Sequence, residues 1–522
     1  MSPSSRIARN VFSNGAGFLI NAVIGILMTP IVTEELGKPA YGFWTLLVAC
    51  TGSYSLLDLG IRSAVGQFVT RYWSRGELEN VSRTISTSVA LMAGTGLCVA
   101  LVATGFAWFG PELFEISGAT DEQASMLFAI VGYGVALNFP LVVAQSATFA
   151  RQRFDLSNAI GISEILIRSG LIVWVLKSDP QDLPFFGQTL GAANGLYGLA
   201  ILTVSMQLLA GLVRVFIARK LLPGVELARR HVRRENVKEL YGYSIFTVLI
   251  NAGDQVMTHS PAFVLAWLLN DEAAGHFGPG ANLVFYGLTL ISAIAWTLTP
   301  QATARDAVGD MDAVRRMWVQ GSRLILTFGG ILAGGIAATG EDFIRLWVGE
   351  EFLSDPEYIS TATIASVLVI GLLVRSTTTT GRQILIGMRR VRFMAAVSLT
   401  EAAIGISLSI VLVHQIGIIG CAVGMATSAT IAQLGLMPRY LSKELGVPVG
   451  EFFREVPRGG VAVVLVMLGT EWLVRPHLTV DGWLTYCVKA AAVTTPGVIA
   501  ALALGTNAEE RARLGRKLGV IR

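Results

Sequence analysis

Long apolar stretches, separated by shorter polar segments, follow one another along almost the whole chain. Each reaches about 20 residues, the length that a helix needs to cross a bilayer. Hydrophobicity is continuous within a stretch rather than alternating, which favours helices over a barrel of strands. The pattern predicts an all-α integral membrane fold with about fourteen spans, approximately at residues 9–31, 42–66, 86–109, 125–148, 159–177, 191–217, 243–268, 278–301, 322–340, 361–384, 393–413, 416–437, 457–475 and 484–505.

One segment of the chain recurs without a gap 233 positions later. Residues 36–83 match residues 269–316, and Gly76 falls on Gly309 within that match. Both copies link very apolar stretches, so one membrane-embedded half is a variation of the other. Paired halves of this kind are typical of secondary transporters.

The repeat predicts how the chain is organised. Six spans precede the longest polar loop and six follow it, whereas the last two spans have no counterpart. We expect an N-terminal six-helix lobe at 1–217, a cytoplasmic linker at 218–240, a C-terminal six-helix lobe at 241–440, and two additional helices with a cytoplasmic tail at 441–522.

Charge orients the predicted spans. The chain has 522 residues, of which 53% are hydrophobic and 15% charged, too apolar for a soluble protein of this size. With the N-terminus inside, 30 of the 40 Lys and Arg residues lie in inner loops and tails. This distribution predicts a multi-pass membrane protein with both termini cytoplasmic. Trp44 and Trp108 lie near predicted interfaces and fit aromatic belts better than sugar stacking.

Several short motifs resemble those of a known family. They are Leu27-Met28-Thr29-Pro30-Ile31, Glu35-Leu36-Gly37 with Ala40-Tyr41-Gly42, Leu56-Leu57-Asp58-Leu59-Gly60, Arg345-Leu346-Trp347-Val348-Gly349-Glu350-Glu351-Phe352 and Gly417-Ile418-Ile419-Gly420-Cys421-Ala422. The chain resembles the O-antigen/polysaccharide (Wzx-type) flippases of the multidrug/oligosaccharidyl-lipid/polysaccharide (MOP) exporter superfamily.

The resemblance implies a MATE-like arrangement, with two parallel six-helix lobes around a central cavity. It also implies that a polyprenyl-diphosphate-linked oligosaccharide passes through a cationic lumen. A polysaccharide polymerase and glycosyltransferases are the partners that this role implies, together with membrane lipids.

Ionisable side chains within spans are costly and therefore informative. Four arginines fall in the inner half of the membrane or near its middle: Arg62, Arg168, Arg375 and Arg382. Guanidinium groups stay charged and bind phosphate oxygens through two parallel hydrogen bonds. Their depth predicts a cationic, pyrophosphate-binding cavity, although Arg382 lies near enough to the surface to snorkel instead. No family motif assigns a role to any one of them.

Two acid–base pairs have the four-residue spacing of neighbours on one helix face. These are Asp58 with Arg62 and Glu164 with Arg168, each with the acid first, the favourable order. Each pair either neutralises itself and fixes helix packing or presents charge to a transport path. Glu164 is also a candidate for binding a coupling ion.

The repeat identifies two more candidate carboxylates. Asn21 corresponds to Asp254 at the offset of 233, and a drift to 237 would align Glu164 with Glu401 and leave Arg168 without a basic counterpart. The C-terminal half then carries Asp254 and Glu401 without an adjacent base. An unpaired carboxylate at mid-depth predicts a site for a coupling proton or sodium ion. The alternative is a protonated or hydrogen-bonded packing residue.

The sequence shows no signature of catalysis. It has no Walker A motif, no Ser/His/Asp constellation and no metal-ligand spacing. We therefore expect no enzyme activity and no cofactor, apart from proton or sodium coupling. The basic loops follow from topology, so nucleic acid is not an expected partner.

These features together predict a flippase. Its substrate is expected to be a polyprenyl-diphosphate-linked oligosaccharide, moved across the cytoplasmic membrane by alternating access for surface polysaccharide biosynthesis. The alternatives are a lipid II flippase, or a multidrug/cation antiporter of the same superfamily. The excess of arginine within the spans disfavours the antiporter, because cationic substrates favour acidic sites.

Overall fold

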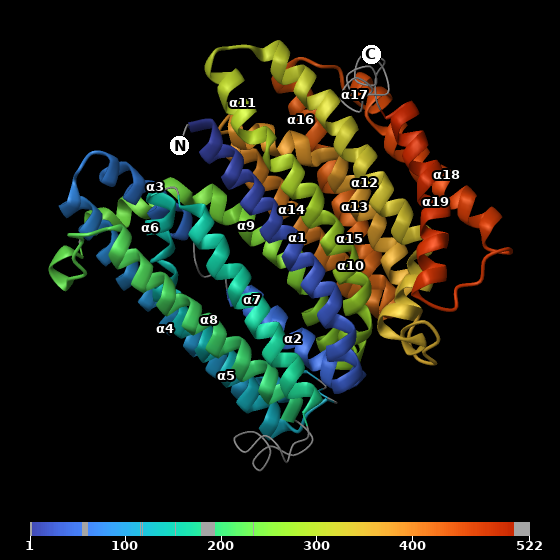
Figure 1. The fold of residues 1–522 in the computed structure, drawn as a ribbon, viewed down its shortest axis with the longest axis horizontal. Coiled ribbons are helices and arrows are strands. Elements are labelled where there is room, and N and C mark those ends of the chain that lie inside the picture. The colour runs from blue at the N-terminus through green and yellow to red at the C-terminus, as the bar shows by residue number, and fades with distance from the viewer. Residues whose placement is uncertain are drawn as a thin grey trace. The chain divides into compact units, whose positions relative to one another are not determined.

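The computed structural model describes residues 3–54, 61–114, 116, 118–151, 153–178, 194–232 and 234–505. Every regular element among these residues is a helix. The chain divides into two compact units, Met1–Gly275 and His276–Arg522. Figure 1 shows that the helices within each unit run alongside one another.

The first unit is built from long helices with short connections. They are α1 (Pro3–Leu36), α2 (Lys38–Tyr54), α3 (Ile61–Ser74), α4 (Leu78–Leu113), α5 (Asp121–Val142), α6 (Gln145–Ala150), α7 (Phe154–Lys177), α8 (Asn194–Leu221), the 3₁₀ turn η4 (Arg229–His231) and α9 (Arg234–Leu268). The first turn of α10 (Asp271–Trp296) completes this unit.

The second unit contains the rest of α10 and the helices that follow. They are α11 (Leu298–Ala307), α12 (Met311–Val348), the 3₁₀ turn η5 (Glu350–Phe352), α13 (Thr361–Gly387), α14 (Val391–Ile416), α15 (Ile419–Ala429), the π-helical turn η6 (Thr430–Leu434), α16 (Gly435–Leu445), α17 (Val449–Glu455), α18 (Pro457–Val474) and α19 (Trp483–Leu504).

Eleven helical segments among the described residues are long and apolar enough to cross a membrane. They correspond to eleven of the predicted spans and confirm an all-α, multi-pass membrane fold. The other three predicted spans, 9–31, 42–66 and 243–268, fall on α1, α2 with α3, and α9. Parts of these helices lie outside the described residues or side chains, so the number fourteen stays a prediction.

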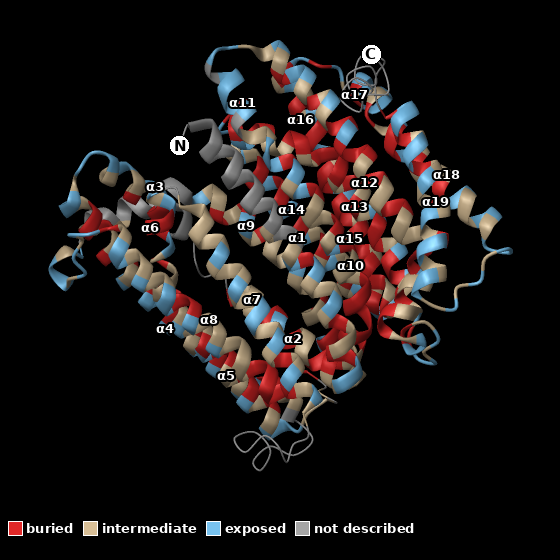
Figure 2. Cartoon of the chain, viewed as in Figure 1, coloured by how far each residue is buried: buried red, intermediate tan, exposed pale blue. Residues whose placement is uncertain are grey.

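Large apolar side chains cover much of the surface, as expected for helices surrounded by lipid. Figure 2 shows buried residues gathered on α12, α13 and α15, and exposed residues along α18 and α19. On these last two helices Leu465, Trp472 and Leu484 are all exposed. A bilayer satisfies such a surface, whereas water does not.

The sequence repeat is visible in the backbone. Gly76 and Gly309 both adopt a left-handed conformation, with φ of 73° and 72°, which glycine tolerates best. In both copies the next residue donates its N–H to a carbonyl five residues earlier, at 3.0 Å. The long helices α4 and α12 then begin at the equivalent residues Leu78 and Met311. These matching turns confirm the offset of 233.

A second pair of turns shows how the offset changes. Before α7 and α14, Arg153 and Arg390 each donate their N–H to a carbonyl five residues earlier, at 2.8 Å. These arginines are 237 positions apart, mainly because α12 and the loop after it are longer than their counterparts. The predicted drift is confirmed, so Glu164 and Glu401 are equivalent residues of the two copies.

Equivalent glycines touch where the first turns of α2 and α10 cross. A Cβ atom on Gly275 would lie 2.6 Å from the Cα of Gly42, and one on Gly42 would collide with the carbonyl of Asp271. The buried Asp271 carboxylate also accepts a hydrogen bond from the N–H of Gly118, at 3.2 Å. Small residues allow this close approach of two backbones.

Helix α9 begins the second sequence copy but packs against α2, α3 and α4 of the first unit. The amide of Gln255 donates to the carbonyl of Gly52, at 3.2 Å. The ring of His259 fills the space that a side chain at Gly52 would need. By its contacts, α9 therefore belongs to the first unit, although the sequence repeat assigns it to the second half.

The two additional C-terminal helices are attached to α12 by close packing and by charge. Backbones approach where a Cβ on Gly330 would lie 2.6 Å from the carbonyl of Gly460. The buried Lys489 of α19 binds Asp342 of α12 at 2.7 Å and Glu471 of α18 at 2.8 Å. These charges satisfy one another within an otherwise apolar region.

The crossing of α2 and α10 yields a stability prediction. Gly42→Ala should lower the unfolding free energy by about 1–3 kcal/mol, because the added methyl group overpacks two touching backbones. Thermal unfolding of the purified protein in detergent measures this change. Gly94→Ala is the matched control, since nothing lies within 4 Å of its added Cβ in the middle of α4. Equal stability of the two variants would contradict the proposed close contact.

Candidate functional site

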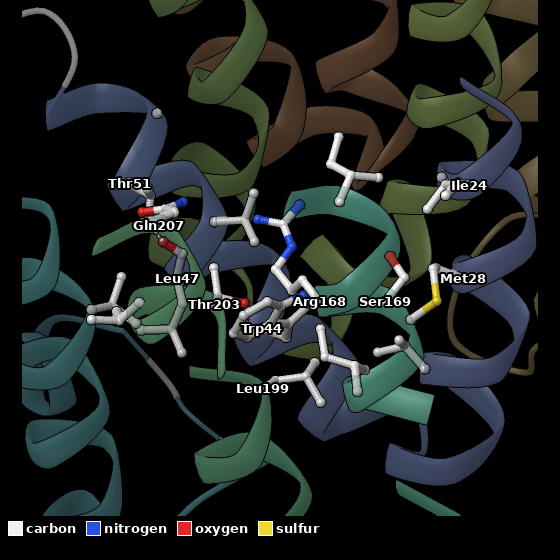
Figure 3. Close-up of a pocket in the computed structure, with 18 of the residues that line it drawn as sticks. Ile24, Met28, Trp44, Leu47, Thr51, Arg168, Ser169, Leu199, Thr203 and Gln207 are labelled. Carbon is white, nitrogen blue, oxygen red and sulfur yellow. Dashed lines mark hydrogen bonds between the residues drawn. The ribbon is translucent and has the colours of Figure 1, made fainter. Parts of the chain in front are cut away.

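A cavity of about 450 Å³ lies within the first unit. Its walls come from α1, α2, α5, α7, α8 and α9, and Figure 3 shows ten of the lining residues by name. The volume falls in the range of about 300–1,000 Å³ that is typical of small-molecule sites. Apolar side chains form most of the wall, so polar groups within it are conspicuous.

Arg168 is the one arginine or lysine among the residues lining this cavity. It extends from α7, with its side chain 25% exposed, and its guanidinium group lies among the cavity-lining side chains in Figure 3. Its Nη1 is 4.0 Å from Glu164 Oε1, one turn earlier. Arg214 of α8 binds the other oxygen of Glu164 more closely, at 3.2 Å. Two arginines thus share one carboxylate, which leaves a net charge of +1.

Four other polar side chains line the cavity without a hydrogen-bond partner among the residues that the structure describes. They are Ser169 of α7, Thr203 and Gln207 of α8, and His259 of α9. Polar groups away from bulk water are normally paired with protein or ordered water. Unpaired donors and acceptors that face one cavity therefore indicate a place where a ligand or water is bound.

Apolar side chains pack together beside the cavity. Val32 of α1, Tyr41 of α2, Ile172 of α7 and Leu199 of α8 form a buried cluster. Trp44 packs against this cluster and also lines the cavity. The cluster lies where α1 ends and α2 begins, and Val32, Ile172 and Leu199 belong both to the cluster and to the cavity lining.

The second unit contains a different arrangement of charge. Arg375 of α13 binds Glu401 of α14, with Nη2 and Oε1 2.6 Å apart. The other oxygen of Glu401 accepts a hydrogen bond from the side-chain amide nitrogen of Gln433, at 2.7 Å. The hydroxyl group of Thr378 donates to the side-chain amide oxygen of Gln433, at 3.1 Å. Glu401 is only 1% exposed. Its two oxygens are thus satisfied by charge-assisted bonds.

Gln433 lies within the π-helical turn η6. A π turn inserts one extra residue into an α-helix and is frequent at functional sites. Here it places the Gln433 amide within hydrogen-bonding distance of the buried Glu401.

The prediction that Glu401 lacks an adjacent base is wrong, because Arg375 is its direct partner. Asp254 is half-buried on α9 and is not isolated either. Glu401 and Asp254 therefore both have partners, contrary to the prediction that they are unpaired. Their role in ion coupling stays a prediction. The predicted pair Glu164–Arg168 is present, but Arg214 is the closer partner of Glu164.

The other residues singled out in the sequence include two arginines and two tryptophans. Arg62 lies on α3, but its side chain is outside the described part of the chain, and so is Asp58. Arg382 is half-buried on α13 and has an interaction of its own. Trp44 does not belong to a lipid-facing belt as predicted, because it packs inside the helix bundle. Trp108 does agree with that prediction, at 76% exposed.

Sequence reasoning missed Arg214 and Gln433. Both act across helices, at separations of 50 and 32 residues from the carboxylates that they bind. The four-residue spacing rule detects only partners on the same helix, so it could not identify these two. Arg214 does lie inside the predicted span 191–217, and its charge at that position was a signal that it has a partner or a function.

Removal of Glu401 should destabilise the protein. Glu401→Ala leaves Arg375 charged without its partner. Breaking a buried ion pair in this way lowers the unfolding free energy by about 3–5 kcal/mol. We expect the lower value because the Arg375 side chain is 23% exposed. Thermal unfolding in detergent measures it, with Glu357→Ala at an exposed site as control. The double change Arg375→Met with Glu401→Leu removes both charges and should restore most of the loss. A double variant no more stable than the single one would contradict this account.

Known membrane transporters share this fold. An inward-facing multidrug resistance MATE family transporter of the MOP superfamily aligns with a TM-score of 0.64 and 13% identity, covering 82% of this chain and 96% of its own. The lipid II flippase MurJ in an inward closed conformation aligns with a TM-score of 0.67 and 13% identity, covering 96% of this chain and 98% of its own. Identities this low support the fold alone.

Relatives by sequence lead to the family. The uncharacterized membrane protein EpsK of Bacillus subtilis (strain 168) is 21% identical over 96% of both chains. A Shigella flexneri protein assigned by name to O-antigen transport is 20% identical over 83% of this chain and 97% of its own. The model of the family described as "Polysaccharide biosynthesis protein" matches residues 7–302. Since this match covers more than half of the chain, the helical membrane protein described above belongs to the polysaccharide biosynthesis protein family.

Proposed function

We propose that the protein flips a polyprenyl-diphosphate-linked oligosaccharide across the cytoplasmic membrane, for surface polysaccharide biosynthesis. Family membership and the relative assigned to O-antigen transport support this role. So does the fold shared with a lipid II flippase. The observation that carries the proposal is the cavity of the first unit with its surplus positive charge at Arg168.

Arg168 is suited to hold the diphosphate. A planar guanidinium group binds two phosphate oxygens at once and keeps its charge. Because Arg214 holds Glu164 at 3.2 Å and Arg168 lies 4.0 Å from it, a phosphate can bind Arg168 without breaking a short ion pair. Apolar walls around the group strengthen this attraction by lowering the local dielectric constant.

Arg375 takes part at a different stage of the cycle. Glu401 holds its Nη2 at 2.6 Å, so a phosphate has to compete with that carboxylate for the guanidinium group. A proton or sodium ion at Glu401 would weaken the pair. Competition of this kind would couple ion binding to substrate movement, with Asp254 and Glu164 as further candidates for the coupling ion. Arg62 and Arg382 remain candidates for the path.

The position of the apolar cluster beside the cavity supports loading from the cytoplasm. The apolar cluster lies where α1 ends and α2 begins. With a cytoplasmic N-terminus, which the distribution of basic residues favours, this is the outer end. The head group would thus enter from the inner side, and the cluster would have to separate before release outside.

Lipid II flipping is the alternative that the cavity accommodates equally well, because lipid II also carries a diphosphate. A cation antiporter fits less well. The cavity-lining residues include one arginine and no aspartate or glutamate, and such a site repels a cationic substrate.

Arg168→Ala should weaken head-group binding and stop export. We expect at least about a tenfold loss of affinity for undecaprenyl diphosphate, because a desolvated charge-assisted contact of about 1.5–3 kcal/mol is removed. Native mass spectrometry of the protein in lipid nanodiscs measures binding, and restoration of surface polysaccharide in a deletion strain measures export.

Lys177→Ala is the matched control, since it removes the same charge from the exposed end of the same helix. It should behave like the unmodified protein in both measurements. If Arg168→Ala binds and exports as well as this control, the cationic site is assigned incorrectly.

A further inference from the structure

Three turns between helices share one hydrogen-bonding pattern, and in one of them an arginine stands where the other two have glycine. In the turns before α4 and α12, Gly76 and Gly309 have φ of 73° and 72°. In the turn between α13 and α14, Arg389 holds this position with φ of 58°. The residue after each of the three donates its N–H to a carbonyl five residues earlier. Within the described part of the chain, Arg389 is the one residue other than glycine with a positive φ.

This backbone conformation is unfavourable for arginine. In the left-handed region a Cβ atom comes too close to the following carbonyl oxygen, and glycine avoids that contact. Strained residues of this kind persist mainly where a function needs them. The Arg389 side chain is exposed, and among the described residues it has no hydrogen bond or ion pair. Packing therefore does not account for an arginine at this position.

Arg389 belongs to a basic surface formed where α13 ends, α14 begins and α16 ends. Arg390 binds Glu444 of α16 at 2.8 Å. Phe393 of α14 stacks on Tyr440 of α16, with ring centroids 3.8 Å apart. These two contacts bring the ends of the helices together. The basic residues of this surface are Arg389, Arg390, Arg392, Arg439 and Lys443, and Glu444 is the single carboxylate within residues 385–393 and 435–445.

Exposed apolar side chains border the basic surface. Ile386 precedes Arg389 by three residues and is 37% exposed, and Leu436 precedes Arg439 by three residues and is 39% exposed. On each helix an apolar side chain thus lies about one turn deeper than a basic one, because the distribution of basic residues places these helix ends at the cytoplasmic surface. A phospholipid has the same order, with acyl chains deeper than its phosphate. An acidic protein would match the charges but not the apolar side chains.

We propose that this basic surface binds the head group of an anionic phospholipid in the cytoplasmic leaflet, with the acyl chains against Ile386 and Leu436. The guanidinium group of Arg389 binds the phosphate, since arginine can bind two phosphate oxygens through parallel hydrogen bonds. Arg390, which is paired with Glu444, holds the turn against α16. Topology explains why basic residues gather at these helix ends. It does not explain why one of them occupies a position that suits glycine.

Photoactivatable lipids can locate this contact. The full-length protein is placed in phosphatidylcholine nanodiscs that contain a small fraction of a diazirine-labelled lipid, either phosphatidylglycerol or phosphatidylcholine with the same acyl chains. Mass spectrometry then identifies the cross-linked peptides. Peptides that contain Ile386 or Leu436 should cross-link to phosphatidylglycerol at least about tenfold more than to phosphatidylcholine.

Arg389→Gly separates the role of the side chain from that of the backbone. It should lower the preference for phosphatidylglycerol about fivefold, the effect of one basic residue near an anionic head group. It should also raise the unfolding temperature in detergent by about 1–2 °C, because glycine relieves the strain. Arg389→Lys keeps the charge and should retain most of the preference.

Arg229→Gly is the matched control. It removes an exposed arginine without a positive φ from the loop after α8, so it should neither change cross-linking at Ile386 and Leu436 nor raise the unfolding temperature. An equal loss of lipid preference in this control would replace the local site by general attraction between a basic protein and an anionic lipid.

Other results would also overturn the proposal. Equal cross-linking of the two lipids to the unmodified protein would exclude an anionic lipid and favour an acidic protein as the partner of this surface. An unchanged lipid preference in Arg389→Gly would show that Arg389 is not a contact. A lower unfolding temperature of that variant would give the arginine a structural role instead. The flippase function stands in each case, because the basic surface is separate from the cavity of the first unit.

Discussion

The bilayer interior offers no water to polar groups, and the rest of this structure follows from that constraint. Backbone groups are satisfied within helices, so every regular element among the described residues is a helix. Buried charges must find partners in protein. Lys489 lies between two carboxylates, and Glu401 receives both Arg375 and Gln433. Against this background, a cavity with several unpaired polar side chains stands out as a place for a ligand.

The internal repeat shows how one half was adapted to that purpose. Glu164 and Glu401 occupy equivalent positions, and each binds an arginine from another helix. The difference lies one turn further on, where the first copy has Arg168 and the second has Gly405. The first copy therefore keeps a positive charge beyond what its carboxylate neutralises. The second copy keeps none at that position, and its Arg375 is fully engaged.

Charge and neutral polarity have complementary roles in the proposed site. Arg168 supplies attraction for any phosphorylated lipid head group and cannot by itself distinguish one carrier-linked glycan from another. Neutral donors and acceptors distinguish ligands by the position of hydroxyl groups, because an unmatched group stays unpaired in the apolar cavity. Thr203 and Gln207 line the same cavity as Arg168, so the proposed site offers a ligand both charge and neutral polar groups.

The sequence predicts the helical membrane fold, the repeat, and even the drift of its offset, because span length and glycine turns are local properties. It also identified Arg168 and the equivalence of Glu164 with Glu401. Which side chains meet depends on how the helices pack, and local patterns do not contain that information. Arg214 reaches Glu164 from another helix, Arg375 engages a carboxylate predicted to be unpaired, and Trp44 turns inward instead of toward lipid. Lipid and helix interior are equally apolar, so hydrophobic patterning cannot tell which face of a membrane helix points into a cavity.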